Sequence, residues 1–152
     1  RSRLHFYLAQ QQAPPGTWPL LLDARGYVTE APGANLIAVK QGRVITLEWQ
    51  ALSGISMQTV KALTKSDTQA VWTLDQLWEG LDELWLTCTP ACMLPVVSLD
   101  GKPIGDGTPG PVFKETVAKW SAMVGVDIQR QIESWDAARP HTTERRVDLA
   151  VR

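Results

Sequence analysis

Two short stretches carry residue types that could do chemistry. Gly26-Tyr27-Val28-Thr29-Glu30 is a β-branched run that follows a turn and ends on a carboxylate. Gly54-Ile55-Ser56 precedes a helical run that starts at Met57, and Ser56 is a good N-cap type. The free N–H groups and the positive dipole end of a helix start can hold an anion such as a phosphate. The two stretches together predict a binding site that offers a carboxylate, Glu30, and an anion-binding helix start at residues 54–56.

Each of these residues also has an ordinary structural interpretation. Glu30 could be a surface glutamate at the end of a hairpin, and Gly54 to Ser56 could be a simple helix cap. Arg3 could be a terminal arginine in solvent. The choice between these interpretations needs agreement from other parts of the chain.

Length and composition fit one ordinary globular domain. The chain has 152 residues, of which 44% are apolar and 20% charged, and its formal net charge is −1. The absence of a basic cluster argues against a nucleic-acid partner. No apolar run approaches a membrane span, and no signal peptide opens the chain, so a cytoplasmic location is the default expectation.

Cys88 and Cys92 are the two cysteines of the chain. Two cysteines are too few for a disulfide framework, and His5 and His141 lie near opposite ends of the sequence, so no metal site is expected. Reduced, buried thiols are the preferred interpretation.

The pattern of apolar residues and breakers predicts interleaved strands and helices. Helices are expected over 4–13, from Met57 to about Leu63, over 74–81 and over 112–124. Strands are expected over 20–23 and 27–31 as one hairpin, over 35–40 and 43–46 as a second, and over 71–72, 83–87 and 94–99.

The fold class is therefore α/β or α+β, with one small mixed β-sheet or pseudo-barrel flanked by helices. Residues 1–135 are expected to form the domain. Residues 136–152 are charged and weakly apolar, so we expect a charged surface tail there.

Four stretches, in the same order, resemble the fold-type IV pyridoxal-phosphate (PLP) enzymes, the class IV aminotransferases. The first is the Gly-Tyr-x-x-Glu run with Asn35 and the apolar residues after it. The others are Ser2-Arg3-Leu4 with Tyr7-Leu8-Ala9, the loop Leu52-Ser53-Gly54-Ile55-Ser56, and residues 82–112 with Thr89, Pro90 and Ala91. The branched-chain aminotransferases and aminodeoxychorismate lyase belong to this family.

The resemblance implies a role for each matched residue. Glu30 would pair with the pyridine nitrogen of PLP, and Arg3 would lie near its phenolic oxygen. Leu52, Gly54, Ile55, Ser56 and Thr89 would hold the cofactor, mainly at its phosphate, and Asn35 would brace the hairpin. Pro90 and Ala91 match the substrate-binding loop, although Pro90 lacks the N–H that relatives have there.

No residue of this chain matches the lysine that links covalently to PLP in the family. We expect that lysine just upstream of Arg1, together with a small N-terminal domain, so that the chain alone would be the inactive large domain of a homodimeric enzyme. The implied reaction is amino transfer between an amino acid, branched-chain-like, and a 2-oxo acid. The alternatives are a lyase of the aminodeoxychorismate type and a non-catalytic scaffold domain.

Overall fold

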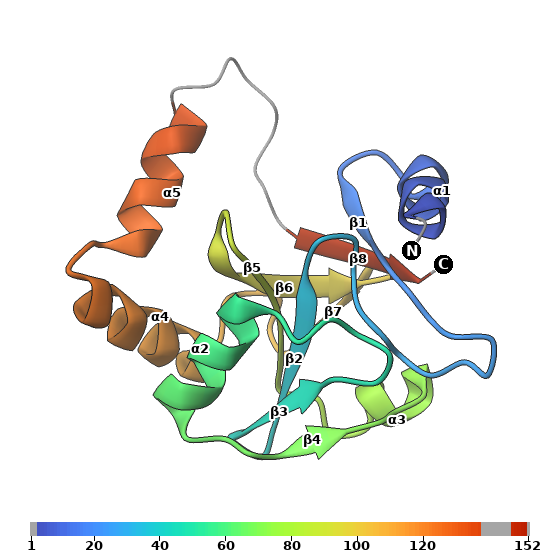
Figure 1. The fold of residues 1–152 in the computed structure, drawn as a ribbon, viewed down its shortest axis with the longest axis horizontal. Helices are drawn as coiled ribbons and strands as arrows, with labels where there is room; N and C mark the ends of the chain where they lie inside the picture. The colour runs from blue at the N-terminus through green and yellow to red at the C-terminus, as the bar shows by residue number, and fades with distance from the viewer. Residues whose placement is uncertain (1–2, 138–146, 152) are drawn as a thin grey trace.

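The computed structural model describes residues 3–137 and 147–151, which form a curved sheet covered by helices (Figure 1). The helices in these ranges are α1 (Leu4–Gln12), α2 (Ile55–Thr64), α3 (Leu74–Trp78), α4 (Pro111–Val124) and α5 (Ile128–Ala137). The strands are β1 (Thr17–Leu20), β2 (Asn35–Lys40), β3 (Arg43–Leu47), β4 (Gln69–Ala70), β5 (Glu83–Cys88), β6 (Cys92–Leu99), β7 (Lys102–Pro103) and β8 (Val147–Val151).

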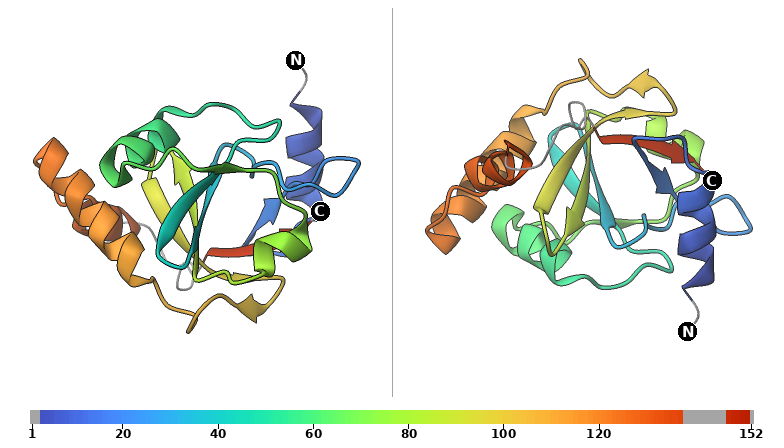
Figure 2. Two further views of the ribbon diagram at one scale, coloured as in Figure 1. Left: turned by 90° about the horizontal axis from the view of Figure 1, so that it is seen from below. Right: turned by 90° about the horizontal axis from the view of Figure 1, so that it is seen from above.

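The strands pair in the order β1-β8-β6-β5-β2-β3-β4, and β7 pairs with β6. The pairs β2–β3, β2–β5 and β5–β6 are antiparallel, whereas β8 is parallel to both β1 and β6. The sheet is mixed and strongly curved (Figure 2). The predicted class, a small mixed sheet flanked by helices, is confirmed.

The central strands are apolar on both faces because each face covers a separate core. Leu36, Ala38, Leu84 and Leu86 face the first core, which Leu77 of α3 also enters. The alternate strand residues Ile37, Val39 and Trp85 face a second core. The helices α2, α4 and α5 contribute Met57, Val60, Phe113, Val117, Trp120 and Ile128 to it. Burial on both sides explains why β2 has a nearly continuous apolar run instead of a polar–apolar alternation.

Most of the predicted elements are found, with shifted ends. The second hairpin is confirmed as β2 and β3, and the helix over 112–124 is confirmed as α4. The first hairpin pairs irregularly, through Leu21–Glu30 and Asp23–Tyr27 backbone hydrogen bonds and a Leu22–Val28 bridge.

Several elements differ from those expected. The structure adds β1, β7 and α5, which were not expected. The short strand expected at 71–72 forms two residues earlier as β4, and the helix expected over 74–81 ends at Trp78. Gly54, not Ser56, is the N-cap of α2, and Ser56 lies in the first turn. Residues 147–151 of the expected tail form β8, where Leu149 is 1% exposed, while 138–146 and 152 lie outside the described residues.

The two cysteines are free, and Cys88 is buried as expected, whereas Cys92 is only partly buried. Cys88 packs into the first core and Cys92 against the second. Burial raises the pKa of both thiols, and the neighbouring Cys88 thiol further raises the pKa of Cys92. Neither cysteine has the depressed pKa of a nucleophile. Within the described ranges, no helix has the length and apolar character needed to cross a membrane.

A buried carboxylate fixes the start of α4 against β5. Glu83 is 7% exposed, and its carboxylate accepts the N–H groups of Val112 and Phe113 at 2.9 Å each and the indole N–H of Trp85 at 3.0 Å. A side chain at Gly110 would collide with it, because an added Cβ would lie 2.1 Å from the Glu83 carboxyl carbon. Glu83 therefore serves as the N-terminal cap of α4, although it lies far away in the sequence.

We predict that Glu83→Gln lowers the free energy of unfolding by about 2 kcal/mol, since the amide offers one acceptor oxygen and turns an NH₂ toward a donor. Urea unfolding of the two proteins measures the difference. Glu115→Gln is the matched control: Glu115 forms an exposed ion pair with Lys119 on the same helix, so its loss should change stability by less than about 0.5 kcal/mol. Equal stability of Glu83→Gln and Glu115→Gln would show that Glu83 does not cap α4.

Candidate functional site

Glu30 and the loop before α2 meet in one hydrogen-bonded group. The Leu52 N–H donates to Glu30 Oε2 at 3.1 Å, and the Asn35 amide donates to the Leu52 carbonyl at 2.7 Å. The same Asn35 nitrogen lies 3.5 Å from Glu30 Oε2. The end of the hairpin, the start of β2 and the loop 52–54 are thus joined through one carboxylate oxygen.

The other carboxylate oxygen of Glu30, Oε1, accepts no hydrogen bond from the described part of the chain. Both protein donors converge on Oε2. A charged donor that approached Glu30 could therefore use Oε1 without displacing the protein's own hydrogen bonds.

Asn35 is the centre of this group and is 5% exposed. Besides its two donor contacts, its side-chain oxygen lies against Gly54, where an added Cβ would come within 2.1 Å of it. Asn35 was expected to brace the hairpin, and in the structure it also joins Glu30 to the loop before α2. A polar residue at the start of a nearly continuous apolar run was the available signal for this role.

The start of α2 offers free backbone donors. Gly54 is the N-cap, and no side chain among the described residues caps the helix. The N–H groups of the first turn, which begins with Ile55 and Ser56, have no partner within the helix. Ile55 is exposed and Ser56 buried, so the donors lie at the boundary between solvent and the sheet.

Thr89, Pro90 and Ala91 form the tip of the β5–β6 hairpin, where Thr89 and Pro90 are exposed. Thr87 near the end of β5 pairs with Asn35 at the start of β2, and α2 packs on β5. The hairpin tip therefore extends past the end of β5 at which Asn35 lies. Pro90 has no N–H, and the Ala91 backbone partly offsets the effect of burial on the pKa of the Cys88 thiol. Thr89 thus offers a side-chain hydroxyl in a tip that has no backbone donor at Pro90.

Arg3 is the expected site residue that lies apart from the others. Its side chain is exposed at the N-terminal end of α1. In both figures of the fold, α1 lies at one side of the molecule and α2 at the other (Figures 1 and 2).

Four residues that were not expected in the site hold the loop before α2: Asp23, Arg25, Tyr27 and Trp49. The Trp49 indole N–H donates to Asp23 Oδ2 at 2.9 Å, and the Arg25 guanidinium lies over the rings of Tyr27 and Trp49. The hydrogen bond from Trp49 is the main reason that the pKa of Asp23 lies below its usual range, so Asp23 is charged at neutral pH.

Thr87 has the one buried side-chain oxygen that lacks a hydrogen-bond partner in the described ranges. It lies opposite Asn35 in the β2–β5 register, on the sheet face that α2 covers. Buried hydroxyls without a hydrogen-bond partner are uncommon, and the Thr87 hydroxyl is a polar group in the otherwise apolar core below α2.

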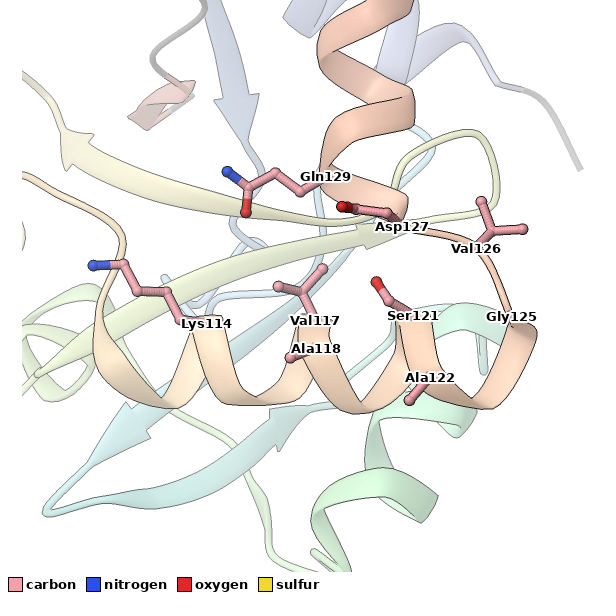
Figure 3. Close-up of a pocket in the computed structure, with 9 residues that line it drawn as sticks. All are labelled: Lys114, Val117, Ala118, Ser121, Ala122, Gly125, Val126, Asp127 and Gln129. Carbon is pink, nitrogen blue, oxygen red and sulfur yellow. The ribbon is translucent and has the colours of Figure 1, made fainter.

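A separate groove of about 500 Å³ lies between α4 and the start of α5 (Figure 3). It contains none of the expected site residues. Its lining combines small and apolar side chains with Lys114, Asp127 and Gln129. No group of three or more metal-ligating side chains occurs in residues 3–137 and 147–151.

We predict that Gly54→Ala lowers the free energy of unfolding by roughly 1–3 kcal/mol, because the new methyl group forces the Asn35 side chain away from Leu52. Urea unfolding measures this loss, with Ser53→Ala in the same loop as a nearly neutral control. The loss should largely vanish in an Asn35→Ala background, where the colliding oxygen is gone. An undiminished loss in that background would contradict the steric explanation.

Comparison with known proteins identifies the family of this chain. The model of the family described as "Amino-transferase class IV" matches residues 1–99. A probable branched-chain-amino-acid aminotransferase from Aquifex aeolicus is 33% identical over 118 residues, which cover 73% of this chain and 38% of that protein. A D-alanine aminotransferase from Bacillus licheniformis is 31% identical over 113 residues, which cover 70% of this chain and 40% of that protein.

A solved structure shows the same similarity in three dimensions. The branched-chain amino acid aminotransferase from Escherichia coli superposes with a TM-score of 0.63 at 32% identity, covering 71% of this chain and 37% of that one. The chain spans less than half the length of each of these three proteins. The matched family model extends from α1 through β6 and includes every residue of the Glu30–Asn35–Leu52 group, and the chain belongs to the class IV aminotransferase family.

Proposed function

We propose that this chain is the PLP-binding domain of an aminotransferase that moves an amino group between an amino acid, branched-chain-like, and a 2-oxo acid. The observation that carries the proposal is the arrangement of Glu30: its Oε2 is held by Leu52 and Asn35, and its Oε1 is left for a ligand. In this proposal residues 1–135 form the cofactor domain together with β8, which lies between β1 and β6 in its sheet. The covalently linked lysine and a small N-terminal domain belong to the remainder of a homodimeric protein.

The residues fit the two polar ends of PLP. Its protonated pyridine nitrogen needs a carboxylate acceptor, which Glu30 supplies, and its phosphate needs several donors, which the uncapped start of α2 supplies. One hydrogen-bonded group joins these two features, so a rigid ligand with a cation at one end and an anion at the other could contact both.

Bound PLP supplies the electron sink that lets an amino acid lose its α-proton. Glu30 would hold a proton at the ring nitrogen and keep that sink electron-poor. The N–H groups of Ile55 and Ser56, the Ser56 hydroxyl and the Thr89 hydroxyl would bind the phosphate, with Leu52 and Gly54 shaping the loop. Arg3 is proposed for the phenolic oxygen from the resemblance alone, because its place at α1 supplies no contact with this group.

The proposal is tested with the protein made from the complete gene. We expect it to copurify with PLP, to show visible absorption, and to exchange amino groups between branched-chain amino acids and 2-oxoglutarate. Release of pyruvate from aminodeoxychorismate without amino exchange would favour the lyase alternative. A colourless protein that binds no added PLP would favour the scaffold alternative.

We predict that Glu30→Gln in that protein lowers kcat about 10²- to 10³-fold, the size typical of losing one preorganised polar group. The neutral amide cannot keep the ring nitrogen protonated by charge. Steady-state kinetics at saturating PLP measures the effect, and Glu115→Gln, an exposed change of the same kind, should leave kcat unchanged. Wild-type kcat in Glu30→Gln would remove Glu30 from the proposed chemistry.

We also predict that Pro90→Ala lowers the KM for the amino acid about three- to tenfold with little change in kcat. The change gives the hairpin tip an N–H that it now lacks, and one added hydrogen bond to a carboxylate is worth this much in binding. Pro15→Ala, another exposed proline, is the control. A KM that stays at the wild-type value would show that the tip does not contact the substrate.

A further inference from the structure

Four side chains tie the turn of the first hairpin to the loop before α2: Asp23, Arg25, Tyr27 and Trp49. We call them the Trp49 clamp. We propose that Trp49 is a positioning residue that fixes the loop 48–54 and thereby determines how tightly the intact enzyme holds the phosphate of its cofactor. This inference rests on the proposed function.

Both carboxylate oxygens of Asp23 accept hydrogen bonds. The Asp23 side chain is 9% exposed, and its Oδ1 accepts the N–H groups of Arg25 at 2.8 Å and Tyr27 at 3.0 Å. Its Oδ2 accepts the Trp49 indole N–H at 2.9 Å. The Asp23 carboxylate is thereby held rigidly in its own turn and presents one oxygen to the loop.

Aromatic contacts fix the orientation of the indole. The Trp49 and Tyr27 rings meet edge to face, with centroids 6.4 Å apart. The Arg25 guanidinium lies 5.1 Å from the Trp49 centroid and 5.3 Å from the Tyr27 centroid. The cation covers both rings, which adds attraction at an exposed edge of the clamp.

The hairpin side of the clamp has its own anchors. Backbone hydrogen bonds join Leu21 to Glu30 and Thr29, and the Val28 N–H donates to the Trp72 carbonyl. The hairpin would keep its place without Trp49. Glu30 is therefore held on the sheet independently of the clamp.

Among the described residues, the loop 48–54 makes no backbone–backbone hydrogen bond to a strand. Residues 48–54 contain no helix or strand, and side chains hold them at intervals. Glu48 pairs with Lys61 of α2 at 2.8 Å, Trp49 contacts Asp23, and Leu52 contacts Glu30 and Asn35. Gly54 and the free donors of α2 follow directly. Loss of the Trp49 contact would free the loop next to the donors proposed for the phosphate.

If the loop 48–54 leaves its binding-competent conformation for part of the time, the apparent affinity for a ligand at the α2 donors falls in proportion to the fraction of molecules that remain competent. The affinity should fall for ligands that contact the α2 donors and should stay unchanged for ligands that do not. PLP and pyridoxal differ by the phosphate alone, so this pair of ligands separates a role at the phosphate from a general loss of structure.

The test uses the protein from the complete gene, with dissociation constants measured by equilibrium dialysis. Trp49→Phe keeps a ring against Arg25 and Tyr27 but removes the N–H. We expect its Kd for PLP to rise about five- to tenfold, the size of one lost hydrogen bond, while its Kd for pyridoxal stays within twofold of wild type. Asp23→Asn should give a similar rise, and the double variant should be no weaker than the weaker single variant.

Ser121→Ala is the matched control. It removes a side-chain acceptor of the Ile128 N–H at the α4–α5 corner, far from the clamp, and should leave both dissociation constants unchanged. If Trp49→Phe does not fold, the Asp23→Asn comparison decides by itself.

Two outcomes would overturn the inference while the proposed function stands. One is wild-type affinity of the variants for PLP, and the other is equal weakening for PLP and pyridoxal. Failure of the wild-type protein to bind PLP at all would overturn the proposed function and the inference together, and that failure is visible before any variant is made.

Discussion

One carboxylate oxygen, Glu30 Oε2, joins the separate parts of the site. It accepts the Leu52 N–H from the loop before α2, and the Asn35 amide lies between it and the Leu52 carbonyl. A hairpin, a central strand and a helix start thus share one acceptor. Without these hydrogen bonds, the distance between the Glu30 carboxylate and the N–H groups at the start of α2 would not be fixed.

The sheet makes this arrangement rigid. β2 is hydrogen-bonded on both edges, to β3 and β5, and its side chains enter a core on each face. The backbone of Asn35, the first residue of β2, is therefore fixed, and this fixes the position from which its side chain reaches Glu30 and Leu52. Glu83 fixes α4 on the same side, and α4 packs on α2, so the helix that offers the donors is held from behind.

Local patterns predicted the elements with strong signals. The Gln41-Gly42 turn between two apolar runs identified the β2–β3 hairpin, and the proline and glycine residues before α4 marked its start. Glu30 and the loop 52–56 were found through the resemblance to a family, since a glutamate after a β-branched run is an ordinary feature by itself.

What the sequence could not provide depends on long-range contacts. β8 (Val147–Val151) follows a charged, weakly apolar segment of the sequence, and it pairs as a strand between β1 and β6. The Asp23–Trp49 contact spans 26 residues, and the Glu83 cap of α4 spans about 30. No local propensity encodes such pairs, and tertiary context also moved the cap of α2 from Ser56 to Gly54.

The central claim is that Glu30 holds a proton on the pyridine nitrogen of PLP. Nitrogen-15 NMR of the protein from the complete gene, loaded with PLP labelled at that nitrogen, measures this directly. The claim predicts a protonated nitrogen in the wild type and a shift toward the unprotonated form in Glu30→Gln. The same nitrogen signal in both proteins would contradict it.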